Sequence, residues 1–305
     1  MVRATRLCKY WHMPGNRIYQ PRVPRSEQRF EIRGADYCVY EWGDPDAPLV
    51  FYLHGWADTG STLQFVVDAL AGDWRVVAPD WRGFGRSTCV SSNYWFPDYL
   101  ADLHELLEIY SSDEPVRLIG HSMGGNAGAL YAGTMPERVR AFVNVEGFGL
   151  PDSDPADAPA RYRDWIEAGR ETPSFADYPS LEALAARIRK RHPAMHASEA
   201  LFVAGEWAFE DAGGTARLRA DPRHKLPGAI LYRRRETLAC CRAVTADVLF
   251  VTGADSEFEQ MLDPLPAPLF PDCRRVAIEG AGHMPHFEAP RALARVIEEF
   301  MLTTL

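Results

Sequence analysis

The stretch from Val116 to Gly125 constrains this chain more than any other, because it joins a strand, a sharp turn and a helix. Val116–Ile119 is short, mostly apolar and rich in β-branched residues, which favours a buried strand. The next five residues, Gly120–Gly124, fit G-x-S-x-G, and Asn126–Thr134 has a helix-like composition. Glycines leave room for a strained turn that lifts the serine hydroxyl above the sheet edge. We therefore predict that Ser122 is a nucleophile.

Strands and helices alternate at short intervals around this stretch, which predicts a mostly parallel α/β sheet covered by helices on both faces. An antiparallel pair, Arg29–Arg33 and Tyr37–Trp42, is expected to begin the sheet. The buried strands are expected at Leu49–Leu53, Trp74–Pro79, Val116–Ile119, Val139–Val145, Val248–Thr252 and Arg275–Glu279. Helical spacing is found at Thr62–Ala71, Asp98–Tyr110 and Pro290–Leu302.

The regular alternation is interrupted by a segment of different composition. An acidic, proline-containing linker at 152–159 leads into a long stretch with helical periodicity and without a strand-like run, including Ser180–Arg191 and Ser198–Trp207. We interpret 150–245 as a helical lid inserted into a core of 29–149 and 246–305. Residues 1–28 are basic and contain no apolar segment of the kind a secretory signal needs, so we expect an irregular arm.

Composition argues against several classes of function. The net charge of −9 gives no reason to expect nucleic acid or a membrane surface as a partner. No apolar run reaches the roughly 18 residues of a membrane helix. The six cysteines form no C-x-x-C pair, which favours a reduced, cytoplasmic protein. His192 and His196 have the i, i+4 spacing of metal ligands, but Pro193 interrupts the helix, and we predict no metal and no cofactor.

A serine nucleophile needs a base and a group that orients the base. His283 follows the last expected strand in a turn containing two glycines, and it comes after the serine in the chain, so it is the favoured base. His286 is its local rival. For the acid we favour Asp255, which follows the strand Val248–Thr252, and we keep Glu146 as the alternative because it follows the neighbouring strand.

The oxyanion formed on attack needs two N–H donors. Met123, directly after the serine, is expected to supply one. The loop after Leu49–Leu53 contains Gly55, which lets the backbone approach closely, and the N–H of Trp56 is the candidate for the second. His54 and His121 are expected to have structural roles. Asp80-Trp-Arg-Gly-Phe-Gly-Arg-Ser87 is interpreted as a tight loop in which Asp80 or Arg82 forms an ion pair.

Taken together, the His54–Trp56 and Asp80–Ser87 loops, the Gly120–Gly125 turn, Asp255 and His283 resemble the α/β-hydrolase fold superfamily, over residues 29–305. The lid stretches Leu181–Pro193 and Arg219–Leu226 look similar to the serine-hydrolase-like subgroup. The resemblance implies a lid that shapes the substrate pocket. Haloalkane dehalogenases and epoxide hydrolases of this fold use an aspartate nucleophile, so Ser122 argues against both, whereas perhydrolases share the serine triad.

The chemistry of this set predicts a serine hydrolase, foremost a carboxylesterase that forms an acyl-enzyme. Aromatic residues in the lid and core loops suggest a small to medium hydrophobic ester as the substrate, although half or more of them are expected simply to pack. The open alternatives are an amidase, a thioesterase or a carbon–carbon bond hydrolase acting on diketones. An α/β-hydrolase that binds without catalysis is the alternative of another class. The lid aromatics are Tyr162, Trp165, Phe175, Tyr178, Phe202, Trp207 and Phe209, and those of the core loops are Trp56, Trp81, Tyr94, Trp95 and Phe96.

Overall fold

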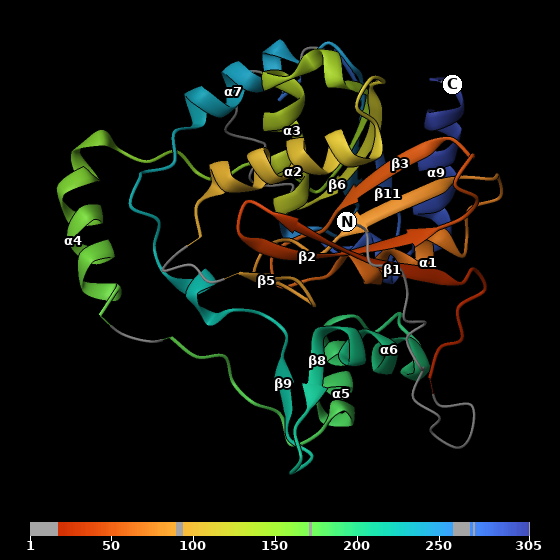
Figure 1. Ribbon diagram of the computed structural model, residues 1–305, viewed down its shortest axis with the longest axis horizontal. Coiled ribbons are helices and arrows are strands. Elements are labelled where there is room, and N and C mark those ends of the chain that lie inside the picture. The colour runs from red at the N-terminus through yellow and green to blue at the C-terminus, as the bar shows by residue number, and fades with distance from the viewer. Residues whose placement is uncertain (1–17, 90–93, 171–172, 259–268, 271, 305) are drawn as a thin grey trace.

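The computed structural model describes residues 18–89, 94–170, 173–258, 269–270 and 272–304. Within these residues the main element is a nine-stranded sheet in the order β1-β2-β4-β3-β6-β7-β10-β11, with β5 beside β2 (Figure 1). The strands are β1 Arg25–Ile32, β2 Ala35–Trp42, β3 Leu49–Leu53, β4 Arg75–Pro79, β5 Thr88–Cys89, β6 Val116–His121, β7 Val139–Val145, β10 Asp247–Gly253 and β11 Cys273–Ile278. The predicted architecture, a mostly parallel sheet with an antiparallel start, is confirmed: β1, β2 and β5 pair antiparallel, and all pairs from β4 to β11 are parallel.

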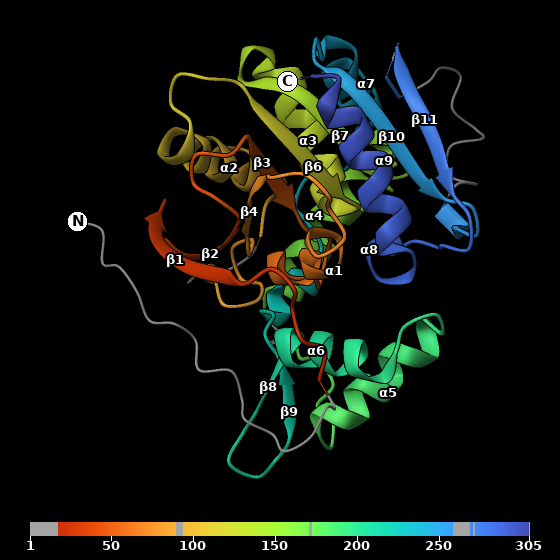
Figure 2. The same ribbon diagram turned by 90° about the vertical axis from the view of Figure 1, so that its right-hand side faces the viewer.

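The sheet is buried on both faces by two layers of helices, as its continuous apolar strands require. One face packs against α2 (Phe96–Tyr110), α3 (Met123–Thr134) and α7 (Arg234–Ala243). The other packs against α1 (Gln64–Val67) and α9 (Pro290–Leu302), which follows the short α8 (Pro285–Glu288). Figure 2 shows α9 lying along β7 and β10. Because β6 is central and every one of its residues is buried, the turn that follows it is held from both sides.

Two segments differ in kind or in placement from the sequence expectation. The helix expected over Thr62–Ala71 is a 3₁₀ turn, η1 Gly60–Leu63, followed by the four-residue α1. Helix α7 falls inside the segment expected as lid, but it lies against α3 of the core. A Cβ added to Gly133 would come within 1.9 Å of the carbonyl oxygen of Cys240, so the two helices meet backbone to backbone. The lid proper therefore ends before α7, and below "lid" means residues 150–233.

The lid contains the two expected helices and a strand pair that was not expected. Its elements are η3 Pro155–Asp157, α4 Ala158–Ala168, α5 Leu181–Arg191, α6 Ala197–Trp207, β8 Ala208–Glu210, β9 Ala216–Leu218 and η4 Pro222–Lys225. The expectation of a lid without strands is wrong, because β8 and β9 are three-residue strands too short to show an alternating pattern. Helices α5 and α6 share an apolar core with Phe65 and Phe287 of the sheet domain, whereas α4 has no buried residue and lies apart from them in Figure 1.

The end of the expected arm ties the lid to the core. Residues 1–17 lie outside the described part of the chain, and β1 already begins at Arg25. The Tyr19 hydroxyl donates to Asp68 of the core, while the Tyr19 backbone N–H donates to the carbonyl of Ser198 in α6. Arg25 forms a buried ion pair, 2.7 Å long, with Glu206 of α6. These contacts place α6 firmly on the sheet domain.

Candidate active site

Ser122 lies on a strained turn between β6 and α3, as predicted. Its backbone has φ 50° and ψ −113°, a conformation that L residues rarely adopt. The flanking glycines are required by space, since a Cβ on Gly120 would lie 2.4 Å from the carbonyl oxygen of Gly124, and one on Gly124 would lie 2.0 Å from that of Leu53. The Ser122 N–H donates to the carbonyl of Val145 in β7, at 2.8 Å. The strained residue is therefore held by the strand beside it.

The structure brings Ser122, His283 and Glu146 into one chain of hydrogen bonds. The distance from His283 Nε2 to Ser122 Oγ is 3.0 Å, and that from His283 Nδ1 to Glu146 Oε2 is 2.9 Å. A carboxylate only accepts hydrogen bonds, so the proton of the neutral imidazole is assigned to Nδ1. The lone pair of Nε2 then faces the serine hydroxyl, as a general base requires.

Glu146 lies at the carboxyl end of the sheet. It follows β7 with φ 58°, and its side chain is completely buried. The Gly253 N–H donates to Oε1 at 2.8 Å, and the Ser256 hydroxyl donates to Oε2 at 2.5 Å. With the His283 N–H, three donors satisfy this carboxylate without a counter-charge.

The expectation that Asp255 orients His283 is wrong. Asp255 is exposed, and its backbone N–H donates to the carbonyl of Ala281. After β10 the chain turns so that Gly253 and Ser256, on either side of it, face inward and bind Glu146. The alternative residue, Glu146, occupies the position, and its extra methylene lets it reach the histidine from the end of β7.

The two expected oxyanion donors lie on either side of Ser122. Met123 is the first residue of α3, where an N–H group has no acceptor inside the helix. On the other side, a Cβ on Gly55 would come within 3.4 Å of the Ser122 Cβ, so the loop carrying Trp56 packs directly against the serine. Ala57 follows with φ 58°, which turns the loop sharply. The role of the two N–H groups stays a prediction.

His54 braces this loop, as expected. Its Nε2 accepts from the backbone N–H of Trp81 at 2.8 Å, and the indole N–H of Trp81 donates back to the carbonyl of His54 at 3.0 Å. Burial lowers the pKa of His54 to about 4, so the ring is neutral and Nε2 remains an acceptor at neutral pH. The loop after β3 and the loop after β4 are thereby held together.

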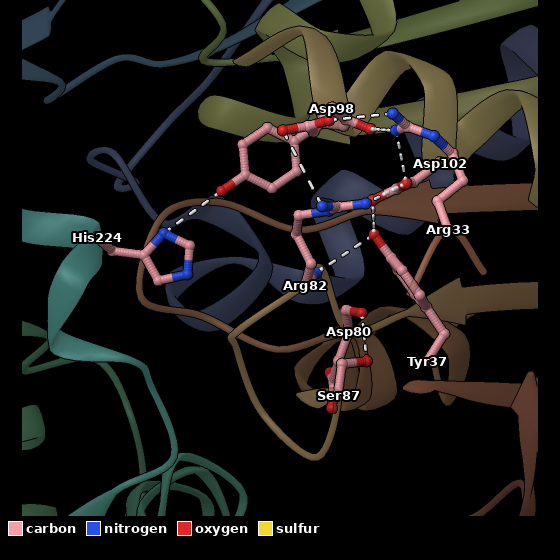
Figure 3. Close-up of polar contacts among 9 residues, drawn as sticks. Arg33, Tyr37, Asp80, Arg82, Ser87, Asp98, Asp102 and His224 are labelled. Carbon is pink, nitrogen blue, oxygen red and sulfur yellow. Dashed lines mark hydrogen bonds and ion pairs between the residues drawn. The ribbon is translucent and has the colours of Figure 1, made fainter. Parts of the chain in front are cut away.

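The loop after β4 is anchored by the structural ion pair expected there, and Arg82 is its cation (Figure 3). Arg82 and Arg33 both contact Asp102 of α2, which is completely buried and also accepts from the Tyr37 hydroxyl at 2.5 Å. Asp80 has a different role: it accepts the backbone N–H groups of Gly60 and Arg86, and burial raises its pKa to about 6.

His224 of the lid is stacked between two aromatic rings of the core. Its ring centroid lies 3.7 Å from that of Phe84 and 3.5 Å from that of Tyr94. Figure 3 shows it reaching from η4 toward the core. Burial lowers its pKa to about 3, so the imidazole is neutral and packs as an aromatic ring. The stack holds the η4 part of the lid against the core.

Apolar side chains lie beside His283 and beside the loop after β3. The ring of Phe258 lies 4.2 Å from that of His283, and Trp56, half exposed, lies 6.2 Å from Phe175 of the lid and 6.5 Å from Phe84. Other expected pocket aromatics have different places: Trp81 is fully buried, Phe202 packs against Phe65 of the sheet domain, and Tyr162 and Trp165 are exposed on α4. Only part of the aromatic set lies near the site.

Sequence reasoning missed a buried polar cluster behind the triad, formed by Asp58, His121 and His286. His286 Nε2 lies 3.2 Å from Asp58 Oδ2, and His121 Nε2 lies 2.8 Å from the carbonyl oxygen of His283. Asp58 also accepts from the Thr62 hydroxyl and from the indole N–H of Trp207 in α6. Two signals in the sequence pointed to this cluster: His121 directly precedes Ser122, and His286 lies three residues after His283.

The other histidine pair noted in the sequence has a structural explanation. His192 ends α5, and its Nδ1 lies 2.8 Å from Glu288. His196 is the N-cap of α6, where its backbone N–H donates to Glu199 at 2.7 Å. The two rings thus belong to different helix ends and have different partners.

A doubly covered parallel sheet, with a serine on the turn after its central strand and a histidine after its last, defines the α/β-hydrolase class. The model of the alpha/beta hydrolase fold family matches residues 48–290, and the chain belongs to this family. A serine hydrolase-like protein of Danio rerio is 26% identical over 293 residues, covering 92% of this chain and 89% of that protein. An esterase of Escherichia coli (strain K12) is 28% identical over 265 residues, covering 84% and 93%.

A solved structure shows the same fold. The thioesterase domain from the curacin biosynthetic pathway superposes with a TM-score of 0.78 at 24% identity, covering 90% of this chain and 99% of that one. Among the described residues, the helices are too short or too polar to cross a membrane. Family and relatives together support a hydrolase of the α/β fold.

Proposed function

We propose that the chain is a serine esterase that cleaves small to medium hydrophobic esters through an acyl-enzyme. The observation that carries the proposal is the continuous contact from Ser122 through His283 to the buried Glu146. A serine hydroxyl is a poor nucleophile at neutral pH, and this chain supplies both the base and the group that fixes its tautomer.

The first half of the reaction transfers the acyl group to the enzyme. Ser122 Oγ attacks the ester carbonyl carbon while its proton moves to His283 Nε2. The negative charge of Glu146, held by two further donors, stabilises the imidazolium that forms. The N–H groups of Trp56 and Met123, together with the N-terminus of α3, stabilise the oxyanion. The tetrahedral intermediate then expels the alcohol, which takes the proton from His283.

The second half releases the acid. Water enters, His283 takes a proton from it, and the hydroxide attacks the acyl carbon on Ser122. The same N–H groups stabilise the second oxyanion, and His283 returns the proton to Ser122 Oγ as the carboxylic acid leaves. One water is consumed for each ester cleaved, and every proton passes through His283.

An apolar substrate is favoured by the side chains at the site. Phe258 lies against His283, and Trp56 faces Phe175 across the border between core and lid. Apolar walls with a few convergent polar groups are typical of small-molecule sites. The E. coli relative is named an esterase, which supports the same substrate class.

A panel of p-nitrophenyl esters of increasing acyl length tests the proposal, with Ser122→Ala as the matched control. We expect turnover that peaks at one chain length and is lost in the variant. A fluorophosphonate probe should label the wild type at Ser122, located by mass spectrometry of the labelled peptide. Labelling without ester turnover would replace the esterase by a thioesterase, an amidase or a diketone hydrolase. Neither labelling nor turnover would favour a protein that binds without catalysis.

A further inference from the structure

A buried cluster of three metal-ligating side chains lies directly behind the proposed triad. Asp58 comes from the loop after β3, His121 from the last position of β6, and His286 from α8. One ligand atom from each lies within 4.8 Å of the other two. All three side chains belong to residues exposed by 2% or less. The proposed reaction uses none of them as nucleophile, base or oxyanion donor.

Each of the two imidazoles has a ring nitrogen whose lone pair is not used in a hydrogen bond. His121 donates from Nε2 to the carbonyl of His283, so its Nδ1 is the unprotonated nitrogen, and His286 donates from Nε2 to Asp58. Within the described part of the chain, the Nδ1 atom of each ring is buried and has no hydrogen-bond partner. Buried ring nitrogens without a partner are uncommon, and two of them beside one carboxylate point to a ligand that the cluster accepts.

One distance in the cluster matches the spacing of two ligands on a metal ion. The 3.2 Å between Asp58 Oδ2 and His286 Nε2 is close to the edge of about 3.3 Å between ligands held about 2.0 Å from a tetrahedral zinc ion. A metal between Asp58 Oδ2 and His286 Nε2 takes the place of the hydrogen bond between them: the Nε2 lone pair binds the metal, and the ring proton moves from Nε2 to Nδ1. His121 is the third ligand. Two imidazoles and one carboxylate suit zinc and similar divalent transition metals better than calcium or magnesium.

We propose that Asp58, His121 and His286 form a site for a divalent transition metal of the zinc class, and that its occupation inhibits the hydrolase. The inhibition rests on the proposed function, whereas the binding does not. The rings of His121 and His283 are 5.1 Å apart, so a dication on His121 lies beside the imidazolium that must form on His283. Like charges at this separation raise the barrier to proton transfer from Ser122.

Burial gives the site a kinetic signature. Because the three ligands are almost inaccessible, an ion can enter only when the structure opens locally, and inhibition should develop slowly. A metal bound instead to the catalytic pair would meet a His283 side chain that is 26% exposed, and inhibition there should be immediate. The time course therefore separates the two places.

The test measures binding and inhibition separately. Equilibrium dialysis against Zn²⁺ with metal analysis should give about one ion for each chain of wild type and of Ser122→Ala, whose binding does not depend on activity. His286→Gln, which keeps an N–H donor for Asp58, should lose the ion. His192→Gln is the matched control, because it breaks another histidine–carboxylate pair outside the cluster, and the effect of zinc on each variant is measured against its own zinc-free rate.

In the activity arm, the enzyme is incubated with Zn²⁺ and turnover of the best p-nitrophenyl ester is followed with time. We expect a slow loss of at least tenfold in wild type and in His192→Gln, recovery with a chelator, and a loss below twofold in His286→Gln. Circular dichroism checks that the variants fold, and Asp58→Asn replaces His286→Gln if the latter does not. Wild-type levels of zinc in the cluster variant, or no bound zinc in wild type, would overturn the proposal. Bound zinc without esterase turnover would refute the function alone.

Discussion

Replacing Glu146 by glutamine tests the site most sharply, because the substitution keeps the shape of the side chain and changes its charge and its hydrogen bonding. The Gly253 N–H needs an acceptor and holds the amide oxygen on its own side. The amide NH₂ group then occupies the place of Oε2, 2.9 Å from His283 Nδ1, and donates to that nitrogen. The imidazole proton moves to Nε2, where it faces Ser122 Oγ, so the ring can no longer accept the serine proton.

The expected loss follows from this tautomer. Replacing the carboxylate of a serine triad by an amide lowers kcat by about 10⁴-fold, which corresponds to about 5 kcal/mol in the barrier. We expect the full loss here, because the Glu146 side chain is completely buried and water cannot take over its role. The assay is single-substrate kinetics on the best p-nitrophenyl ester, with the unfolding temperature measured for each variant.

Asp255→Asn is the matched control, because Asp255 was the residue favoured from the sequence and is exposed. We expect its kcat to change by less than about twofold, as for most surface substitutions. A folded Glu146→Gln variant that retains more than about a tenth of wild-type turnover would refute the reasoning. So would an Asp255→Asn variant that loses as much as Glu146→Gln.

Two further substitutions test how the lid and core are held together, and a third tests the ion pair that anchors the loop after β4 within the core. Trp207→Phe removes a partly buried hydrogen bond to the carboxylate of Asp58 and should lower the free energy of unfolding in urea by about 2 kcal/mol; an unchanged value would contradict the contact. His224, with a pKa lowered to about 3, should cost the fold about 2 to 3 kcal/mol as the pH falls from 6.5 to 4.5, because the unfolded chain takes up the proton first. In His224→Phe, the free energy of unfolding in urea should vary less over that pH range. An unchanged pH dependence would show that other groups cause it. Asp102→Asn leaves Arg82 buried beside a neutral amide and should lower the unfolding free energy by about 3 to 5 kcal/mol, whereas a loss below 1 kcal/mol would show that the pair is dispensable.

The parts of the site that sequence predicts best are those encoded by neighbouring residues. The turn at Ser122 depends on two glycines within two positions of it and on a strand and a helix beside it, so one short motif describes it. His283 could be predicted equally well, because its turn follows the last strand and comes after Ser122 in the chain, as expected. The positions of the main strands and of the lid helices α5 and α6 follow from periodicities of the same local kind.

The acid could not be predicted in this way, because its position depends on contacts between distant segments. Glu146 reaches His283 only because β7 pairs with β10, which places Gly253 and Ser256 beside it. Asp255 was favoured because it lies between Ser122 and His283 in the chain and follows a strand. The turn after β10, however, directs Ser256 inward and leaves Asp255 exposed. The β8–β9 hairpin and the core position of α7 were missed for similar reasons: one pair of strands is very short, and packing on Gly133 is invisible in the sequence.

The segment that carries the catalytic histidine is held by three carboxylates from three parts of the chain. Glu146 holds the His283 ring, Asp58 holds the His286 ring, and Glu288 accepts the backbone N–H of Gly282 at 2.6 Å. Glu288 also contacts His192 at the end of α5, and Asp58 also contacts Trp207 at the end of α6. Two of the three supports are therefore shared with the lid. A displacement of α5 or α6 on substrate binding must strain the bonds that set the His283 turn. We therefore expect substitutions at the lid ends of these bonds to change kcat as well as KM, although they lie outside the triad.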